Sequence, residues 1–263
     1  MIVAATLGLG LLIGLSLGAL GGGGSVLTVP ALVYVIGQDA RAATTSSLFI
    51  VGITSAIAAL GHARSGRVRW GVGVAFGITG IAAGFAGTVV NRLVDPDVLL
   101  LGFATVIVVA AVGMLASSGD ETLPREEGDA PQPARRRTAG WIGRIAGAGL
   151  LVGFMTGLFG VGGGFVIVPA LTLALGMSMP RAVGTSLVVI SINSGGALLA
   201  RAGTAQFDWA VIVPFTLAAV AGSLGGARVA SRVSGTTLTR VFAVLLLAVA
   251  AYTATSSLIS LFG

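Results

Sequence analysis

Two stretches of this chain carry nearly the same sequence 139 residues apart, and this repeat limits the folds that the chain can adopt. Gly21–Gly37 reads GGGGSVLTVPALVYVIG and Gly160–Gly176 reads GVGGGFVIVPALTLALG, so 8 of 17 aligned positions are identical. The match continues from Arg41–Ser46 (RAATTS) to Arg181–Ser186 (RAVGTS). In a hydrophobic chain, a duplicated unit interrupted by Gly and Pro at corresponding places indicates the central binding site of a transporter.

The composition places the chain in a lipid bilayer. Its mean hydropathy is +1.02, and only 9% of its residues are charged, whereas soluble domains carry about 25%. The net charge of +6 comes from arginines that lie between apolar runs, so it indicates membrane topology and we predict no nucleic-acid partner. The absence of Cys excludes disulfides and thiolate metal sites.

Ten apolar segments are separated by short polar connections. They span about residues 2–20, 26–37, 42–61, 70–91 and 97–116 in the first half, and 141–160, 165–177, 182–200, 208–228 and 237–261 in the second. Most approach the ~20 residues that cross a ~30 Å hydrocarbon core. The second and seventh are short and are predicted to end at Gly37 and Gly176. The sequence therefore predicts an all-α polytopic membrane protein with about eight spans, or ten segments counting the two short ones.

The distribution of charged residues predicts where the two halves meet and how the helices are oriented in the membrane. The polar stretch 117–140 is predicted to be a hydrophilic linker between a first transmembrane repeat, 1–116, and a second, 141–263. If each half crosses the membrane an odd number of times, 12 arginines lie on one side and only Arg41, Arg92 and Arg201 on the other. Four spans per half would give 9 against 6. The positive-inside rule favours the first arrangement, which is an inverted repeat with both termini outside the cytoplasm.

The Gly motifs suggest a site for an anion. Consecutive glycines let the backbone approach a ligand closely, and Thr28 is predicted to cap a short helix that opens at Pro30. A helix N-terminus carries about half a positive charge, so two such ends at one centre would stabilise a small anion. The alternative is that the glycines serve only close helix packing.

Polar residues on the long helices extend this candidate site. Hydroxyls at the first turns of two helices can donate to a substrate, or can bond to helix carbonyls instead. A buried Asn193 must find hydrogen bonds, so it would line the site or bridge helices. The candidate substrate-binding residues are Gly22, Gly23, Gly24, Ser25, Thr28, Thr45, Ser46, Gly162, Gly163, Gly164, Thr185, Ser186 and Asn193.

The remaining ionisable residues give little sign of chemistry. His62 is the only histidine; it aligns with Arg201, so we predict an interfacial position and not a proton relay. No Asp or Glu falls inside a predicted span, whereas cation-coupled transporters often place a carboxylate there. We therefore predict a mechanism without a coupling cation, or with a proton carried on the substrate, and no metal or other cofactor.

The paired motifs resemble those of the TauE/SafE family of sulfite and organosulfonate exporters. The resemblance rests on the duplicated Gly-rich element with its Val-Pro-Ala-Leu ending, on Arg-Ala-x-x-Thr-Ser, and on the polar linker, and it covers almost the whole chain outside the linker. It implies transport of a small sulfur-containing anion across the cytoplasmic membrane of a prokaryote. Ser25 against Gly164 and Thr44 against Gly184 depart from exact duplication.

Two other functions are weighed against transport. Ser186 with His62 could form a nucleophile and base in an intramembrane hydrolase, but the chain has no metal motif of the His-Glu-x-x-His kind. A structural membrane subunit that transports nothing would give the paired Gly motifs no purpose. The expected partners are a small anion and the bilayer, and the sequence leaves open whether the chain forms a homo-oligomer.

Overall fold

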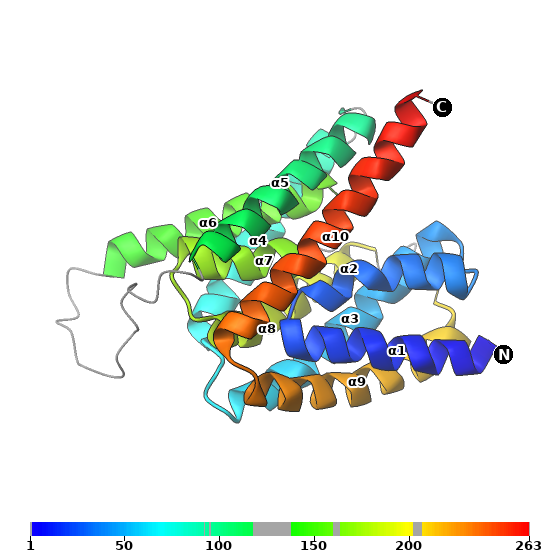
Figure 1. The fold of residues 1–263 in the computed structure, drawn as a ribbon, viewed down its shortest axis with the longest axis horizontal. Helices are drawn as coiled ribbons and strands as arrows, with labels where there is room; N and C mark the ends of the chain where they lie inside the picture. The colour runs from blue at the N-terminus through cyan, green and yellow to red at the C-terminus, as the bar shows by residue number, and fades with distance from the viewer. Residues whose placement is uncertain are drawn as a thin grey trace.

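The computed structural model describes residues 2–91, 93–94, 96–117, 138–159, 164–201 and 207–262. These residues form α-helices and two π-helical segments, with no strand among them (Figure 1). The first half contains α1 (Ile2–Leu20), α2 (Gly23–Pro30), η1 (Ala31–Val35), α3 (Ala40–Ala63), α4 (Trp70–Asn91) and α5 (Pro96–Ser117). The second half contains α6 (Thr138–Phe159), α7 (Gly164–Pro169), η2 (Ala170–Ala174), α8 (Met179–Ala200), α9 (Trp209–Arg232) and α10 (Gly235–Phe262).

Every predicted apolar segment corresponds to a helix, which confirms the all-α polytopic prediction. Within the described residues, α3, α4, α6, α8 and α9 contain apolar runs long enough to cross a membrane. The two short segments, Gly23–Val35 and Gly164–Ala174, are apolar but too short to cross. Most of the predicted linker lies outside the described residues, and α6 begins at Thr138.

Both short segments are broken at the same place. Proline lacks an N–H and its ring crowds the preceding turn, and each α-helical part ends at its proline, Pro30 or Pro169, before a π-helical turn. The N–H of Ile36 then reaches the carbonyl of Ala31, five residues earlier, at 3.2 Å. The short helix therefore begins at Gly23, and the prediction that it opens at Pro30 with Thr28 as its cap is wrong. Thr28 instead lies inside α2.

Each short segment also ends in the same way, as the sequence predicts. Gly37 and Gly176 adopt positive φ of 80° and 64°, which L-residues with a side chain rarely adopt. Beyond each glycine, one backbone N–H returns to the last turn: Gln38 N donates to Leu32 O at 2.9 Å, and Met177 N donates to Leu171 O at 3.0 Å. This closure satisfies carbonyls that a helix end would otherwise leave unpaired.

Glycines join each half to the other through two close helix pairs. A Cβ added to Gly14 of α1 would overlap the backbone of Ala219 in α9, and one added to Gly18 would overlap that of Ser223. We call this the α1–α9 seam; its two helices run parallel. In the α4–α6 seam, a Cβ on Gly153 would likewise overlap the backbone of Gly80. Backbone contact of this kind needs small residues, so both seams are tightly packed.

The long central helices of the two halves cross in opposite directions. A Cβ on Gly52 of α3 would lie 3.0 Å from Ser194 Cβ in α8, and one on Gly184 would lie 3.2 Å from His62 Cβ. The start of α8 therefore lies beside the end of α3, so these helices, which the repeat makes equivalent, are antiparallel.

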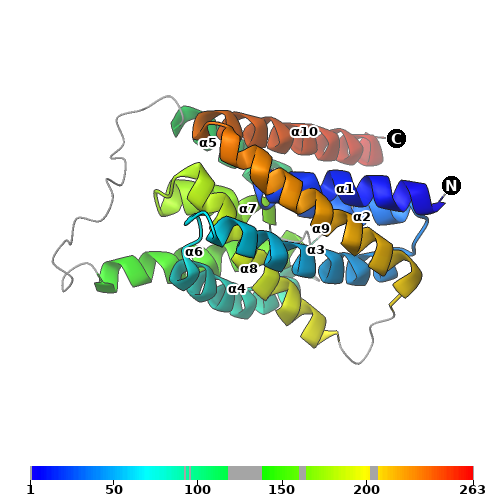
Figure 2. The ribbon, with the colours of Figure 1, turned by 90° about the horizontal axis from the view of Figure 1, so that it is seen from below.

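The same contacts place the other helices around this crossing. α9 runs parallel to α3, because the rings of Phe49 and Trp209 are 5.3 Å apart and Gly61 lies near Leu224. α4 packs against α8. The outer helices α5 and α10 pack together along one side of the molecule (Figures 1 and 2). The starts of both short segments are therefore buried among the long helices, whereas Tyr34 and Leu173 in their last turns are exposed.

Candidate functional site

The two short segments start against one another inside the molecule. A Cβ on Gly22, the residue that precedes α2, would overlap the backbone of Gly164, the first residue of α7. A Cβ on Gly164 would lie 2.9 Å from Gly22 Cα and 2.5 Å from Ser25 Oγ. Only glycine fits at either position. We call this contact the glycine crossing; it is made by one motif from each half.

Two serine hydroxyls lie at the glycine crossing. Ser25, in the first turn of α2, donates to Gly22 O at 2.7 Å and is buried. Ser186 of α8 lies on the other side of the turn: a Cβ on Gly21, where φ is +72°, would lie 2.5 Å from its Oγ. Ser186 donates to Val183 O at 2.8 Å and is fully buried. Each oxygen keeps acceptor capacity, and each hydroxyl can rotate toward a ligand.

Three other candidates of the first half lie in α2, and Thr45 lies in the first turns of α3. Gly23 and Gly24 begin α2, and a Cβ on Gly24 would lie 2.6 Å from the carbonyl oxygen of Ile13 in α1. Thr28 donates to Gly24 O at 3.2 Å, and Thr45 donates to Arg41 O at 3.1 Å. These two hydroxyls bond to their own helices.

The remaining candidates are spread along α3 and α8. Ser46 is fully buried, and its Oγ has no hydrogen-bond partner among the described residues. Thr185 accepts the backbone N–H of Arg69 at 3.1 Å and so holds the α3–α4 loop. Asn193 lies beside Gly80 of α4, about 10 Å along α8 from Ser186 at 1.5 Å per residue. Gly162 and Gly163 lie outside the described residues.

The described aspartates at the starts of α3 and α9 cap those helices, whereas the α3–α4 loop with Arg67 and Arg69 packs against the start of α8 at Gly184 and Thr185. Asp39 accepts from the N–H groups of Arg41 and Ala42 at the start of α3, and Asp208 accepts from Ala210 N at the start of α9. No group of three His, Asp or Glu residues able to hold a metal occurs in the described part of the chain. The crossing thus offers the hydroxyls of Ser25 and Ser186, which suit a ligand that accepts hydrogen bonds.

His62 is more buried than the sequence indicated. The structure buries it to 2% exposure, and its Nε2 lies 2.8 Å from Gly18 O near the end of α1. The sequence did not predict this burial, and the position at the membrane interface stays a prediction. The basic loop that follows suggested an interface, but α3 continues past His62 to Ala63, and its last turn is covered by α1 and α8. The carbonyl partner fixes Nε2 as the protonated nitrogen of the neutral ring.

Replacing His62 tests whether it fixes the end of α1. His62→Ala leaves the Gly18 carbonyl without its side-chain partner and opens a cavity, so we expect a loss of about 1–3 kcal/mol in unfolding free energy. His62→Gln, which can still donate, should recover part of it. Thermal unfolding in detergent measures both variants. A His62→Ala protein as stable as the wild type would show that the hydrogen bond is dispensable.

Long apolar helices around two broken helices define a multi-pass membrane transporter. Residues 6–253 match the family model described as "Sulfite exporter TauE/SafE", and the chain belongs to this family. The resemblance noted in the sequence is therefore confirmed.

Relatives that are described as probable membrane transporters come from bacteria and archaea. A "Probable membrane transporter protein" of Xylella fastidiosa is 35% identical over 94% of this chain and 93% of its own length. One from Methanocaldococcus jannaschii is 30% identical over 72% of this chain and 68% of its own. One from Bacillus subtilis is 24% identical over 86% of each. No solved structure matches the chain.

Proposed function

We propose that this protein moves a small sulfur oxyanion or organosulfonate across the cytoplasmic membrane and binds it at the glycine crossing. The observation that carries the proposal is the contact of Gly22 with Gly164, which brings the two duplicated motifs to one place. A sulfite-like group presents several acceptor oxygens, and the crossing presents donors. The family's description as a sulfite exporter supports this substrate class.

The local chemistry favours an anion over a cation. Helix α2 starts at Gly23 without a side-chain cap, so its first N–H groups face the crossing, where helix starts attract negative charge. The hydroxyls of Ser25 and Ser186 add two rotatable donors. The described charged residues nearest in sequence, such as Asp39 and Arg41, lie at a helix start and not at the crossing.

The antiparallel packing of α3 and α8 supports an inverted repeat. Equivalent helices of an inverted repeat run in opposite directions, and repeats of this kind work by moving one bundle against another. The seams suggest which helices move together: α1 with α9, and α4 with α6. Each bundle would then combine helices of both halves, and motion would occur at the α3–α8 contact and the glycine crossing.

The proposal includes a membrane topology and a direction of transport. The positive-inside rule places the linker in the cytoplasm and both termini outside. A membrane potential negative inside contributes ~2.3 kcal/mol per charge per 100 mV, which favours anion export. Relatives described as membrane transporters support transport over hydrolysis or a purely structural role. A homo-oligomer remains compatible with this arrangement.

Anion binding tests the proposal most directly. We expect sulfite, thiosulfate or sulfoacetate to raise the unfolding temperature of the purified protein, since a ligand at 100 times its Kd stabilises by ~2.7 kcal/mol. Acetate and chloride at matched ionic strength are the controls. Sulfur-anion flux into proteoliposomes under an imposed potential gives the second readout. Absence of both a shift and flux with every sulfur anion would refute the proposal.

The serines provide the residue-level test. Ser25→Ala and Ser186→Ala each remove a donor to a charged ligand, a bond worth about 1.5–3 kcal/mol, so we expect KM for transport to rise at least tenfold. Ser231→Ala is the matched control, because that serine is exposed and bonds only to Arg228 O. Unchanged KM in both crossing variants, with transport intact, would move the site elsewhere.

A further inference from the structure

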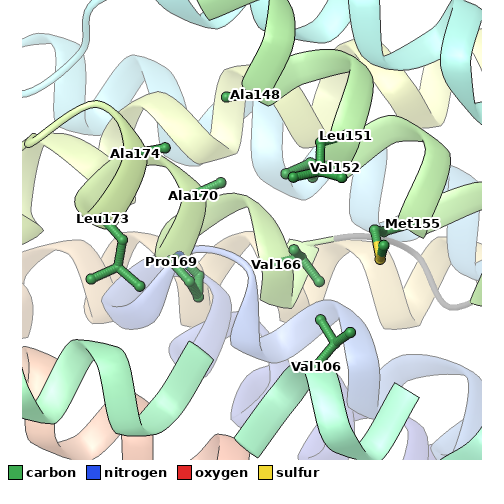
Figure 3. Close-up of a pocket in the computed structure, with 10 residues that line it drawn as sticks. All are labelled: Val106, Ala148, Leu151, Val152, Met155, Val166, Pro169, Ala170, Leu173 and Ala174. Atoms are coloured by element: carbon green, nitrogen blue, oxygen red, sulfur yellow. The ribbon is translucent and has the colours of Figure 1, made fainter. Parts of the chain in front are cut away.

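A cavity lies between α5, α6 and the second broken segment (Figure 3). It has a volume of about 320 Å³, and every side chain that lines it is apolar. Ala148 and Leu151 of α6 form one wall, and Pro169 and Ala170, at the joint between α7 and η2, form the other. Val106 of α5 closes a third side. The cavity therefore touches the bend of one broken helix without reaching the glycine crossing.

The first half differs at the equivalent positions. The repeat aligns Ala148 with Leu9 and Ala174 with Val35, so the first half carries larger side chains at two of the three alanines that line the cavity; Ala170 aligns with Ala31, and Met155 with the smaller Ser16. Leu9 is partly buried and packs against the cluster that contains Ile13 and Ala31. The substitution of leucine by alanine thus accounts for open space beside the second broken helix.

The cavity is continuous with the surface that meets the bilayer. Of the five long apolar helices, α6 has the smallest share of its span buried in the protein, 22%. Leu151 and Leu173, at the rim, are 60% and 43% exposed. In a membrane protein such side chains face lipid, so acyl chains have direct access to the cavity. A cavity of this size without an occupant would forfeit the dispersion contacts of its whole lining.

Size distinguishes a lipid from a second copy of the chain. One turn of a helix about 10 Å wide and 5.4 Å long occupies roughly 400 Å³ with its side chains, which is comparable to the cavity of about 320 Å³. A helix of another copy could therefore insert only side chains. An acyl chain is a flexible apolar thread that can enter and fill the space.

We propose that this cavity binds one acyl chain of a membrane phospholipid and that the chain supports the α7–η2 joint. The joint needs such support because the proline interrupts the helical hydrogen bonds at this point. The second broken helix is then held partly by lipid, whereas the first is held by Leu9. The inference rests on the membrane location of the protein and stands apart from the identity of the transported anion.

Filling the cavity tests the proposal. Ala148→Leu and, separately, Ala174→Val introduce the residues that the first half carries at these positions. Displacement of two chain methylenes lowers affinity by about tenfold or more, so we expect at least a tenfold loss of retained phospholipid in native mass spectra of the detergent-purified protein. Gly147→Leu is the matched control, because it adds the same side chain next to Ala148 where no other atom lies within 4 Å. Folding is checked by thermal unfolding.

The outcomes are distinct. Loss of lipid in both filling variants, with retention in Gly147→Leu, supports the acyl-chain site. Equal lipid in all of these folded proteins overturns it. Dissociation of a dimer in the filling variants without loss of lipid would assign the cavity to a second copy, which also overturns it. Because lipid retention is measured without transport, a failure here leaves the anion proposal standing, and the reverse holds too.

Discussion

A disulfide that joins Gly52→Cys on α3 to Ser194→Cys on α8 is expected to stop transport, and reduction is expected to restore it. The two Cβ positions lie 3.0 Å apart, close to the 3.5–4.5 Å of natural disulfides. The chain has no cysteine of its own, so no background thiol interferes. If the bundles move against one another at the α3–α8 contact, a covalent link there holds one conformation. We expect flux in proteoliposomes to fall at least tenfold under oxidising conditions.

The control is a link within one proposed rigid body. Gly10→Cys and Ala218→Cys join α1 to α9 across their seam, and their Cβ positions are also 3.0 Å apart; because the Cβ of Gly10→Cys would lie 2.8 Å from the carbonyl oxygen of Phe215, flux of the reduced double variant is compared with the wild type first. We expect oxidation of this pair to leave flux within twofold of the reduced protein, once folding has been checked by size exclusion. The opposite result would contradict this assignment of rigid and moving helices: oxidation inhibits transport in the protein linked across the seam and leaves it unchanged in the protein linked between α3 and α8.

A single methyl group at Gly22 is expected to disable the protein. In Gly22→Ala the new Cβ would overlap the backbone of Gly164, and a backbone atom cannot rotate away as a side chain can. Overpacking usually lowers the free energy of unfolding by about 1–3 kcal/mol. Because the clash here is with backbone, we expect Gly22→Ala to lose about 3 kcal/mol or more. Because the two motifs must separate to relieve the clash, sulfur-anion flux should also be lost.

The matched substitution lies on the neighbouring helix. Gly8→Ala in α1 adds the same methyl group where no other atom lies within 4 Å, and alanine favours a helix over glycine by about 1 kcal/mol. We expect this variant to unfold at or above the wild-type temperature with normal flux. A Gly22→Ala protein that matched it in thermal unfolding and flux would disprove the close approach of the two motifs.

The helices were predictable from sequence because each is an apolar run bounded by polar or glycine-rich connections. The ends of α1 and α4 agree with prediction to the residue, and the breaks fall where proline and glycine require them. The start of the short helix was predicted wrongly, at Pro30. A threonine shortly before a proline is a common pattern at the start of a helix. In the structure the helix already begins at Gly23, where α2 packs against α1 and α7.

The Gly motifs at the centre of the candidate site could be predicted from the sequence, whereas the partners of the surrounding side chains could not. Repetition alone singled out the Gly motifs, because a local pattern that occurs twice is unlikely to arise from packing at one place. The partners of individual hydroxyls depend on which helix lies opposite, as Thr185 and Arg69 show. The burial of His62 depends on the end of α1, more than forty residues earlier in the chain. Such contacts join distant residues and leave no periodic signal.

The α1–α9 seam can form only late in the synthesis of the protein. The glycine face of α1 leaves the ribosome long before its partner α9, which begins at Trp209. During most of synthesis α1 therefore lies in the membrane without the helix that its Gly14 and Gly18 are shaped to meet. Until about the last fifth of the chain emerges, the glycine face of α1 must therefore contact lipid, α2 or the insertion machinery. A protein truncated before α9 would be a target for membrane quality control, however well its earlier helices insert.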